Sequence, residues 1–285
     1  MKKEATKVVE GEDLDVLIGS MPKEDDEEDK NEKELVKNNI LNILKNKYDM
    51  EEDDFLSAEI EVVPAGKARD FGLDRSMVMA YGQDDKVCAY TSLRAFLDVD
   101  KAERTISCIL VDKEEIGSVG STGMESSFYE NAIQEICVLL GHNEVTALSR
   151  TLSNSYMLSS DVNAAYDPLY ADVMDKRSAS YFNNGVVFCK YTGSRGKSGS
   201  NDADAEYIAK LRKIMDDNNV YFQISELGKV DAGGGGTIAY ILANKSVNVI
   251  DCGVGVLSMH APWEVTAKAD IYEAYKCYVA FLKEA

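Results

Sequence analysis

Two adjacent glutamates, Glu114 and Glu115, stand in the stretch Val111-Asp-Lys-Glu-Glu-Ile-Gly-Ser-Val-Gly-Ser-Thr-Gly123, between an apolar run and a glycine-rich turn. Neighbouring side chains at the end of a strand point to opposite faces. One carboxylate can therefore bind a metal ion while the other takes a proton from a water molecule, as metal-assisted hydrolysis requires. A solvated turn is the more common outcome for such a cluster, so the stretch alone is weak evidence for a metal site.

Further polar residues occur at the ends of predicted strands and helices. Asp84 and Asp85 precede a predicted helix, and Asp161 follows a predicted strand. His260, one of two histidines, stands between an apolar run and a predicted helix. Each has a structural alternative, because aspartates at such positions commonly cap helices or close turns.

A glycine run, Asp231-Ala-Gly-Gly-Gly-Gly-Thr-Ile238, precedes a predicted helix. Exposed backbone amides at a helix start favour an anionic or carbonyl oxygen. The run lacks the Lys-Ser/Thr of a phosphate loop and the strand and GxGxxG pattern of a dinucleotide fold. Nucleotide binding is therefore not predicted.

Apolar periodicity predicts the elements that position these residues. The predicted strands are 105–111, 156–160, 186–191, 220–224 and 247–251, and the predicted helices are 87–97, 126–140, 205–215, 237–244 and 271–282. Strands that alternate with helices predict an α/β fold with a mixed, largely parallel sheet covered by helices on both sides. In such sheets ligands collect at the ends of strands.

The N-terminal part has a different pattern. Residues 35–48 show the apolar spacing of a helix, and residues 14–18 and 58–62 are predicted strands. Residues 21–34 are rich in acids and predict a mobile, solvated loop.

Composition excludes several classes of function. A chain of 285 residues with 45% apolar content can form one large domain with an appendage. A net charge of −19 argues against binding to nucleic acid or to an anionic membrane surface. No apolar run reaches the roughly 18 residues of a membrane span, and no secretory segment is evident, so we predict a cytoplasmic protein. The six dispersed cysteines predict reduced, buried thiols.

Five motifs occur together in one order along the chain. They are Gln83-Asp84-Asp85, Asp112-Lys-Glu114-Glu115-Ile-Gly-Ser118, Leu158-Ser-Ser-Asp161, the glycine run before Thr237, and Leu257-Ser-Met-His260-Ala-Pro-Trp-Glu264. In order and spacing they resemble the aspartyl-aminopeptidase-like family of dizinc metallopeptidases. The resemblance covers nearly the whole chain and is strongest from Val63 onward.

The resemblance implies a role for each matching residue. Asp84 resembles the carboxylate that bridges two metal ions, and Glu114 resembles the general base. Glu115 and His260 resemble the other ligands of one metal ion, and Asp161 resembles a ligand of the second. A shell of histidine and carboxylates suits zinc, with cobalt or manganese as alternatives.

One family feature has no counterpart here, because no histidine precedes His142 in the sequence. The family carries a further histidine ligand in a His-x-Asp motif near its N-terminus. The comparison implies that this chain begins within the family's domain. Residues 1–63 would be the remnant of a β-rich inserted lid domain, and residues 64–285 would be the catalytic domain, incomplete on its N-terminal side. Only the metal site of Asp84, Glu115 and His260 would then be complete.

Two functions follow from the resemblance. The first is a metalloaminopeptidase that hydrolyses N-terminal residues from peptides by metal-activated water, with Glu114 as the base and Gly236 and Thr237 holding the substrate. Lys190 is a candidate to face an acidic N-terminal residue, and an exposed basic loop is the alternative for it. The second is a truncated homologue with weak or no activity that retains one metal site and a role in assembly, since the missing histidine puts activity in question. The resemblance also implies a homo-oligomer, or a partner that supplies the missing N-terminal segment.

Overall fold

A computed structural model describes residues 11–23, 34–195, 198–229, 231 and 233–285. The chain divides into two units, Met1–Val62 and Val63–Ala285. Because each unit has its own internal contacts, each is described by itself. Among the described residues, no helix is both long enough and apolar enough to cross a bilayer.

The first unit contains one helix of several turns, α1 (Leu35–Tyr48), where the sequence predicts it. Two short 3₁₀ helices, η2 (Gly11–Asp13) and η3 (Glu52–Leu56), lie on either side of it along the chain. The strands predicted at 14–18 and 58–62 are wrong, since residues 11–23 and 34–62 form no strand. Alternating apolar residues make a strand only where a neighbour can pair with them, and no described residue of this unit does so. Residues 24–33 of the predicted acidic loop lie outside the described residues.

The second unit is built on a four-stranded sheet with the order β3-β7-β5-β6. Its strands are β3 (Tyr156–Ser159), β7 (Asn248–Gly253), β5 (Val186–Cys189) and β6 (Phe222–Ser225). β3 pairs with β7 and β5 pairs with β6 in parallel, whereas β5 and β7 are antiparallel. The sequence predicts all four strands.

A second sheet of five strands has the order β1-β2-β9-β8-β4. Its strands are β1 (Arg69–Phe71), β2 (Met77–Ala80), β9 (Glu264–Ala267), β8 (Gly255–Leu257) and β4 (Asn163–Ala164). Only β4 and β8 pair in parallel. The predicted α/β class with mixed strand pairing is confirmed, but the strands form two sheets, and this second one is mainly antiparallel.

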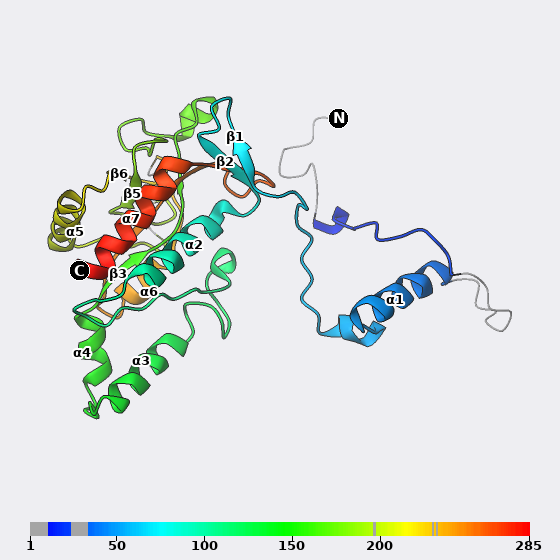
Figure 1. The fold of residues 1–285 in the computed structure, drawn as a ribbon, viewed down its shortest axis with the longest axis horizontal. Coiled ribbons are helices and arrows are strands. Elements are labelled where there is room, and N and C mark those ends of the chain that lie inside the picture. The colour runs from blue at the N-terminus through cyan, green and yellow to red at the C-terminus, as the bar shows by residue number, and fades with distance from the viewer. Residues whose placement is uncertain (1–10, 24–33, 196–197, 230, 232) are drawn as a thin grey trace. The chain divides into compact units, whose positions relative to one another are not determined.

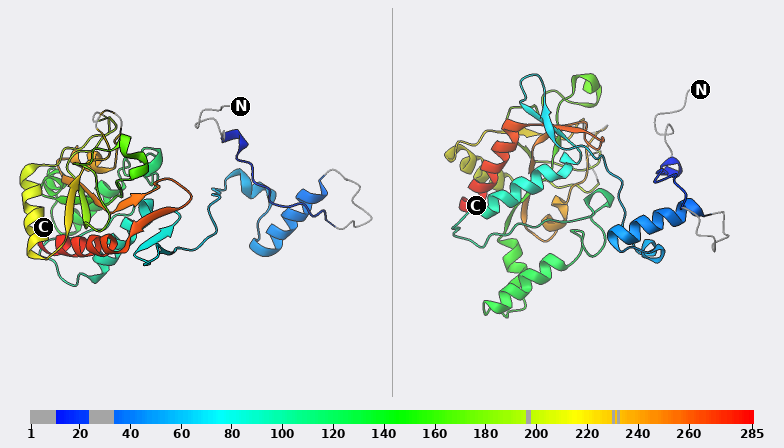
Figure 2. Two further views of the ribbon diagram at one scale, coloured as in Figure 1. Left: turned by 90° about the horizontal axis from the view of Figure 1, so that it is seen from above. Right: turned by 45° about the vertical axis from the view of Figure 1, so that its right-hand side comes forward.

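Helices cover both faces of the four-stranded sheet. On one face α2 (Gln83–Asp98), α5 (Ala205–Asp217) and α7 (Lys268–Glu284) pack against Ile250 and Cys252 of β7. On the other face α4 (Ala147–Ser153) and α6 (Ala239–Ala243) pack against Val249. Figures 1 and 2 show α7 lying beside α2, and α3 (Phe128–Leu139) lying beside α4. The prediction of helices on both sides is therefore confirmed.

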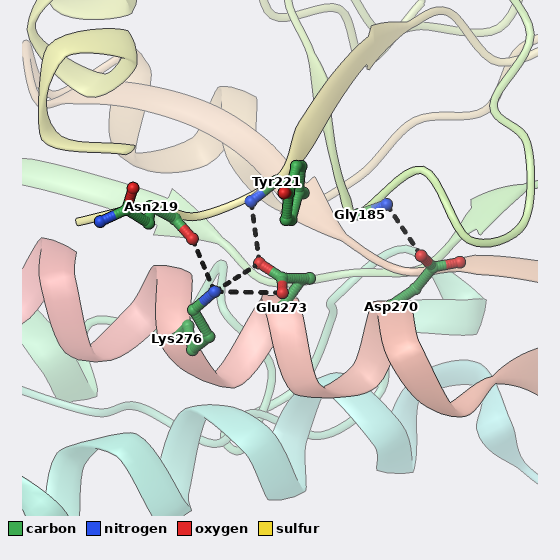
Figure 3. A network of polar contacts seen from close by, with 6 residues as sticks. All are labelled: Gly185, Asn219, Tyr221, Asp270, Glu273 and Lys276. Carbon is green, nitrogen blue, oxygen red and sulfur yellow. Dashed lines mark hydrogen bonds and ion pairs between the residues drawn. The ribbon is translucent and has the colours of Figure 1, made fainter. Parts of the chain in front are cut away.

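Helix α7 also holds the starts of two strands, as Figure 3 shows. The carboxylate of Asp270 accepts hydrogen bonds from the backbone amides of Asn183 and Gly185, both at 2.8 Å, just before β5. Glu273 accepts one from the amide of Tyr221 at 2.8 Å, just before β6. Charge-assisted hydrogen bonds of this kind fix backbone position. The helix therefore sets the two parallel strands side by side.

The strand predicted at 105–111 is wrong. These residues are half-buried or exposed, with Leu110 56% exposed, and they form no strand. A short apolar run becomes a buried strand only when other strands flank it, and no described strand does so here. The segment 107–111 instead borders a cavity beside β3.

A short 3₁₀ helix, η5 (Pro168–Val173), follows β4. The side chain of Asp167 accepts a hydrogen bond from the amide of Leu169 and so caps its start.

Candidate metal centre

Asp84 and Asp85 lie at the start of α2, as predicted. Gly82 precedes the helix with a left-handed φ of 68°, which glycine adopts without strain. The first turn is not helical at the aspartates, whose ψ angles are 107° and 33°. The peptide bond between them is cis.

Glu114 and Glu115 lie in a single-turn 3₁₀ helix, η4 (Glu114–Ile116), and not at the end of a strand. Lys113 precedes the turn with a φ of 66°, and Gly117 ends it with a φ of 95°. The amide of Gly117 donates to the carbonyl of Glu114 at 2.8 Å, and the amide of Ser118 donates to that of Lys113 at 2.7 Å. The glycine-rich turn therefore fixes the backbone of both glutamates.

Asp161 follows β3, as predicted, and a glycine on the neighbouring strand makes room for it. A Cβ atom on Gly253 of β7 would lie 1.8 Å from the carbonyl oxygen of Asp161. Real Cβ atoms do not approach that closely. The absence of a side chain at position 253 thus lets the chain bring Asp161 to the end of the sheet.

His260 follows β8 in a turn where it has a φ of 64°. Its backbone amide donates to Glu264 Oε1 at 2.7 Å, while the backbone amide of Asp84 donates to Glu264 Oε2 at 3.0 Å. Glu264 lies in β9 and is only 2% exposed. One buried carboxylate thus joins two segments that are far apart in the sequence.

These turns bring three predicted ligands together. His260 Nε2 lies 3.0 Å from Asp84 Oδ2 and 3.3 Å from Glu115 Oε1. The side chain of Asp84 is 11% exposed, while those of His260 and Glu115 are 61% and 60% exposed. The group therefore opens to solvent on the side of His260 and Glu115.

A second group contains Asp84, Asp85 and Asp161, with one oxygen of each within 4.8 Å of the others. Asp84 belongs to both groups. Asp85 is a candidate ligand that sequence reasoning missed, since its position before α2 favoured a helix cap. Its Oδ1 is buried and has no hydrogen-bond partner among the described residues.

Electrostatics at the site disfavours charge on these carboxylates. Burial raises the pKa of Asp84 to about 6, with a further rise from Glu115 and an opposing effect of His260. Burial also raises the pKa of Asp85, Asp161 and Glu114, and neighbouring carboxylates raise each of them further. Carboxylates that converge in a poorly solvated place are stabilised by a cation. The imidazole and carboxylate donors, together with the unpartnered Asp85 oxygen, fit zinc.

The candidate substrate residues lie outside both groups. Gly236 and Thr237 lie just before α6, and the Thr237 hydroxyl accepts a hydrogen bond from the amide of Ala239 at 3.3 Å. Lys190 is largely exposed and forms an ion pair with Asp202.

Comparison with known proteins shows the family of the chain. A family model described as "Aminopeptidase I zinc metalloprotease (M18)" matches residues 2–282. The chain belongs to this family. A probable M18 family aminopeptidase 1 from Clostridium acetobutylicum is 60% identical over 282 residues, which are 99% of this chain and 60% of that protein. A relative with the same description from Thermotoga maritima is 44% identical over 288 residues, 100% of this chain and 62% of its own length.

Solved structures of similar proteins share the fold. The crystal structure of aminopeptidase I from C. acetobutylicum has a TM-score of 0.88 and 59% identity, and the match covers 99% of this chain and 60% of that one. A structure of the Saccharomyces cerevisiae mApe1 dodecamer has a TM-score of 0.62 at 24% identity over 77% of this chain and 48% of that one, which shows the fold alone. The chain spans about 60% of the length of the curated relatives that it matches.

Proposed function

We propose that this chain acts as a metalloaminopeptidase that removes N-terminal residues from peptides. The observation that carries the proposal is the convergence of His260, Asp84 and Glu115 within 3.0 to 3.3 Å. Membership of a family described as zinc metalloproteases supports it. Zinc bound there would polarise the scissile carbonyl and lower the pKa of water.

Each nearby residue has a distinct part in this proposal. Asp84, Glu115 and His260 would hold one zinc ion, and Asp84 would bridge to a second ion held by Asp161, with Asp85 as a further candidate. Glu114 would take the proton of the attacking water and pass it to the leaving amine. It suits this role because it is half-buried, it lies outside both ligand groups, and burial raises its pKa, which makes it a better base.

We propose that the backbone around Gly236 and Thr237 holds the peptide, since its amides precede a helix. Lys190 is a candidate for contact with an acidic N-terminal residue. Its ion pair with Asp202 would have to open first.

Substitution of the base tests the proposal. The Glu114→Gln variant should bind as much zinc as the parent chain, because Glu114 belongs to neither ligand group. Its turnover of aminoacyl chromogenic substrates should fall about 100- to 10,000-fold, as expected for loss of a general base. Turnover within about threefold of the parent would refute the role of Glu114. Comparison of the parent chain's turnover with zinc, cobalt and manganese would identify the ion that supports most activity.

The second candidate is a homologue with one complete metal site that is weakly active or inactive alone. The all-carboxylate composition of the group Asp84, Asp85 and Asp161 favours it, because zinc sites usually include nitrogen or sulfur ligands. Zinc content near one ion per chain, without turnover, would support this candidate.

The partner of such a homologue would be the N-terminal segment of the family. A cavity of about 610 Å³ lies beside the candidate metal centre, bordered by β3 and by residues 107–111. β3 is the terminal strand of its sheet, so an added strand could pair with it. The part of the C. acetobutylicum relative that this chain does not cover is the probe. Stable binding with protection of the β3 amides would support the proposal, and failure to bind at micromolar concentrations would contradict it.

We also propose that the chain forms homo-oligomers in the cytoplasm. The yeast mApe1 structure is that of a dodecamer, and this chain shares its fold. If the proposal holds, light scattering should give a mass at least twice the 31.4 kDa of one chain. A mass of 31.4 kDa would contradict it.

A further inference from the structure

Asp251 is a buried carboxylate in the middle of the four-stranded sheet. It lies on β7, where its register partners are Ser159 of β3 and Cys189 of β5. It is only 4% exposed, and neither of its oxygens has a hydrogen-bond partner among the described residues. Ser159 Oγ beside it is also buried and unpartnered. Burial of an unpaired carboxylate is costly, so its presence calls for a physical reason.

Three hydroxyls surround this carboxylate. Burial raises the pKa of Asp251 to about 6, and the hydroxyls of Thr237, Ser159 and Thr192 oppose that rise. They are near enough to stabilise the charge, although none stands in hydrogen-bonding geometry. Thr192 and Thr237 belong to two different loops, so Asp251 faces both loops at once.

These two loops, residues 192–195 and 233–237, are joined to each other. The amide of Gly193 donates to the carbonyl of Gly235 at 2.9 Å, and the amide of Arg195 donates to that of Gly233 at 3.1 Å. A Cβ atom on Gly234 would lie 2.3 Å from the Gly193 carbonyl oxygen, so the approach requires glycine. We call these residues the loop pair.

Hydrogen bonds hold both threonines of the loop pair that face Asp251. The amide of Asn201 donates to Thr192 Oγ1 at 3.3 Å, and the Asn201 side chain donates to the carbonyl of Val249 on β7 at 2.9 Å. On the other side Thr237 accepts a hydrogen bond from Ala239 at the start of α6. Both threonine side chains are thus held at the base of the loops, next to the sheet.

The loop pair leads directly to the cavity beside the candidate metal centre. Ile238, which follows Thr237, lines that cavity together with Asp84 and Asp161, and Asp251 belongs to neither ligand group. A residue placed in this way can influence where the loops stand beside the centre without binding the ion.

We propose that Asp251 is a positioning residue that anchors the loop pair through the hydroxyls of Thr192 and Thr237, and so sets the place of Gly236 and Thr237 beside the metal centre. A small rotation of either threonine side chain completes the hydrogen bonds. The consequence for peptide binding rests on the proposed function, whereas the anchoring itself does not.

Hydrogen exchange tests the anchoring without any need for activity. The Asp251→Asn and Thr237→Val variants of the full chain should each raise the exchange rate of the Gly193 and Arg195 amides about tenfold or more, because a hydrogen bond to a charged group is lost. Thr237→Ser keeps the hydroxyl and should leave these rates within about twofold of the parent. Zinc content should be unchanged in all three variants, since none alters a candidate ligand.

Two results would overturn the inference. One is exchange at Gly193 and Arg195 that stays within about twofold of the parent in both Asp251→Asn and Thr237→Val. The other is an equal rise at the amide of Tyr221, which is held by Glu273 on α7 and would report general loosening. If the parent chain hydrolyses peptides, Asp251→Asn should raise KM with little change in kcat. If the parent has no activity, the proposed function fails and the exchange result still decides the anchoring.

Discussion

Glu264 offers the sharpest test of how the metal centre is built. Its buried carboxylate accepts one hydrogen bond from the backbone amide of Asp84 and one from that of His260. The Glu264→Ala variant leaves two partly buried amides without this acceptor, at up to about 1–3 kcal/mol each, so unfolding free energy should fall by no more than about 2–6 kcal/mol. Glu264→Gln keeps one carbonyl acceptor and should lose about half as much. Because both amides belong to ligand residues, zinc affinity should fall about 10- to 100-fold in either variant.

Urea denaturation of the zinc-free protein gives the first quantity, and titration with a fluorescent zinc chelator as competitor gives the second. Glu135→Gln on the exposed face of α3 is a matched control, because it makes the same chemical change away from the site. A Glu264→Ala variant with parental zinc affinity would refute the reasoning, since the hydrogen bonds would then not position the ligands. Equal loss of stability in Glu264→Ala and Glu264→Gln would show that charge, and not the number of acceptors, matters.

Three further predictions follow from the same structure. Gly253→Ala should abolish zinc binding or folding, because the new Cβ would lie 1.8 Å from the Asp161 carbonyl oxygen. Gly11→Ala is the control and should behave as the parent, because a Cβ there has nothing within 4 Å. Zinc titration and circular dichroism check both variants. The pKa of Asp251 is raised to about 6 in the folded state, so the folded protein binds more protons than the unfolded one, and stability should fall as pH rises from 4 to 6. That fall should be smaller by about 3 kcal/mol in Asp251→Asn, measured by urea denaturation across this range, and identical slopes for parent and variant would contradict it. Zinc at 100 times its Kd should stabilise the parent by about 2.7 kcal/mol, so removing it with a chelator should lower the unfolding free energy by that amount. The unfolding free energy of His260→Ala should not depend on zinc. A chelator effect that persists in His260→Ala would exclude this residue as a ligand.

The predictable part of the fold is the part with long apolar periods. The helices at 35–48, 83–98 and 268–284 each span several turns, so that their periodicity is evident in the sequence. Strands β1, β4 and β8 of the second sheet contain only two or three residues, which is too short for an alternation to be recognised. The error at 105–111 has another cause, because a buried strand is defined by its neighbours, and an apolar run carries no information about them.

The predictable part of the site is the part made of side chains with distinctive chemistry. His260, Asp84, Glu115 and Asp161 could be named because their motifs resemble those of a metallopeptidase family, and the structure brings each of them into one of the two groups. Their roles as ligands stay predictions until metal is measured. Asp85 was missed because the resemblance implied no role for it, which left only the usual interpretation of a carboxylate before a helix as a cap.

The residues that position the ligands, Glu264 and Gly253, are harder to recognise in the sequence. Glu264 accepts hydrogen bonds from backbone amides, which every residue except proline carries. The residue types at positions 84 and 260 therefore do not indicate that Glu264 is their partner. Gly253 acts by having no side chain, and its importance depends on the carbonyl oxygen of Asp161, which is distant in the sequence. Residues that bind an ion can be recognised in the sequence by their own chemistry. Residues that position those ligands can be recognised only from distances in the folded chain. It follows that substitutions at Glu264 and Gly253 should damage zinc binding as severely as loss of a ligand, although neither residue belongs to a ligand group.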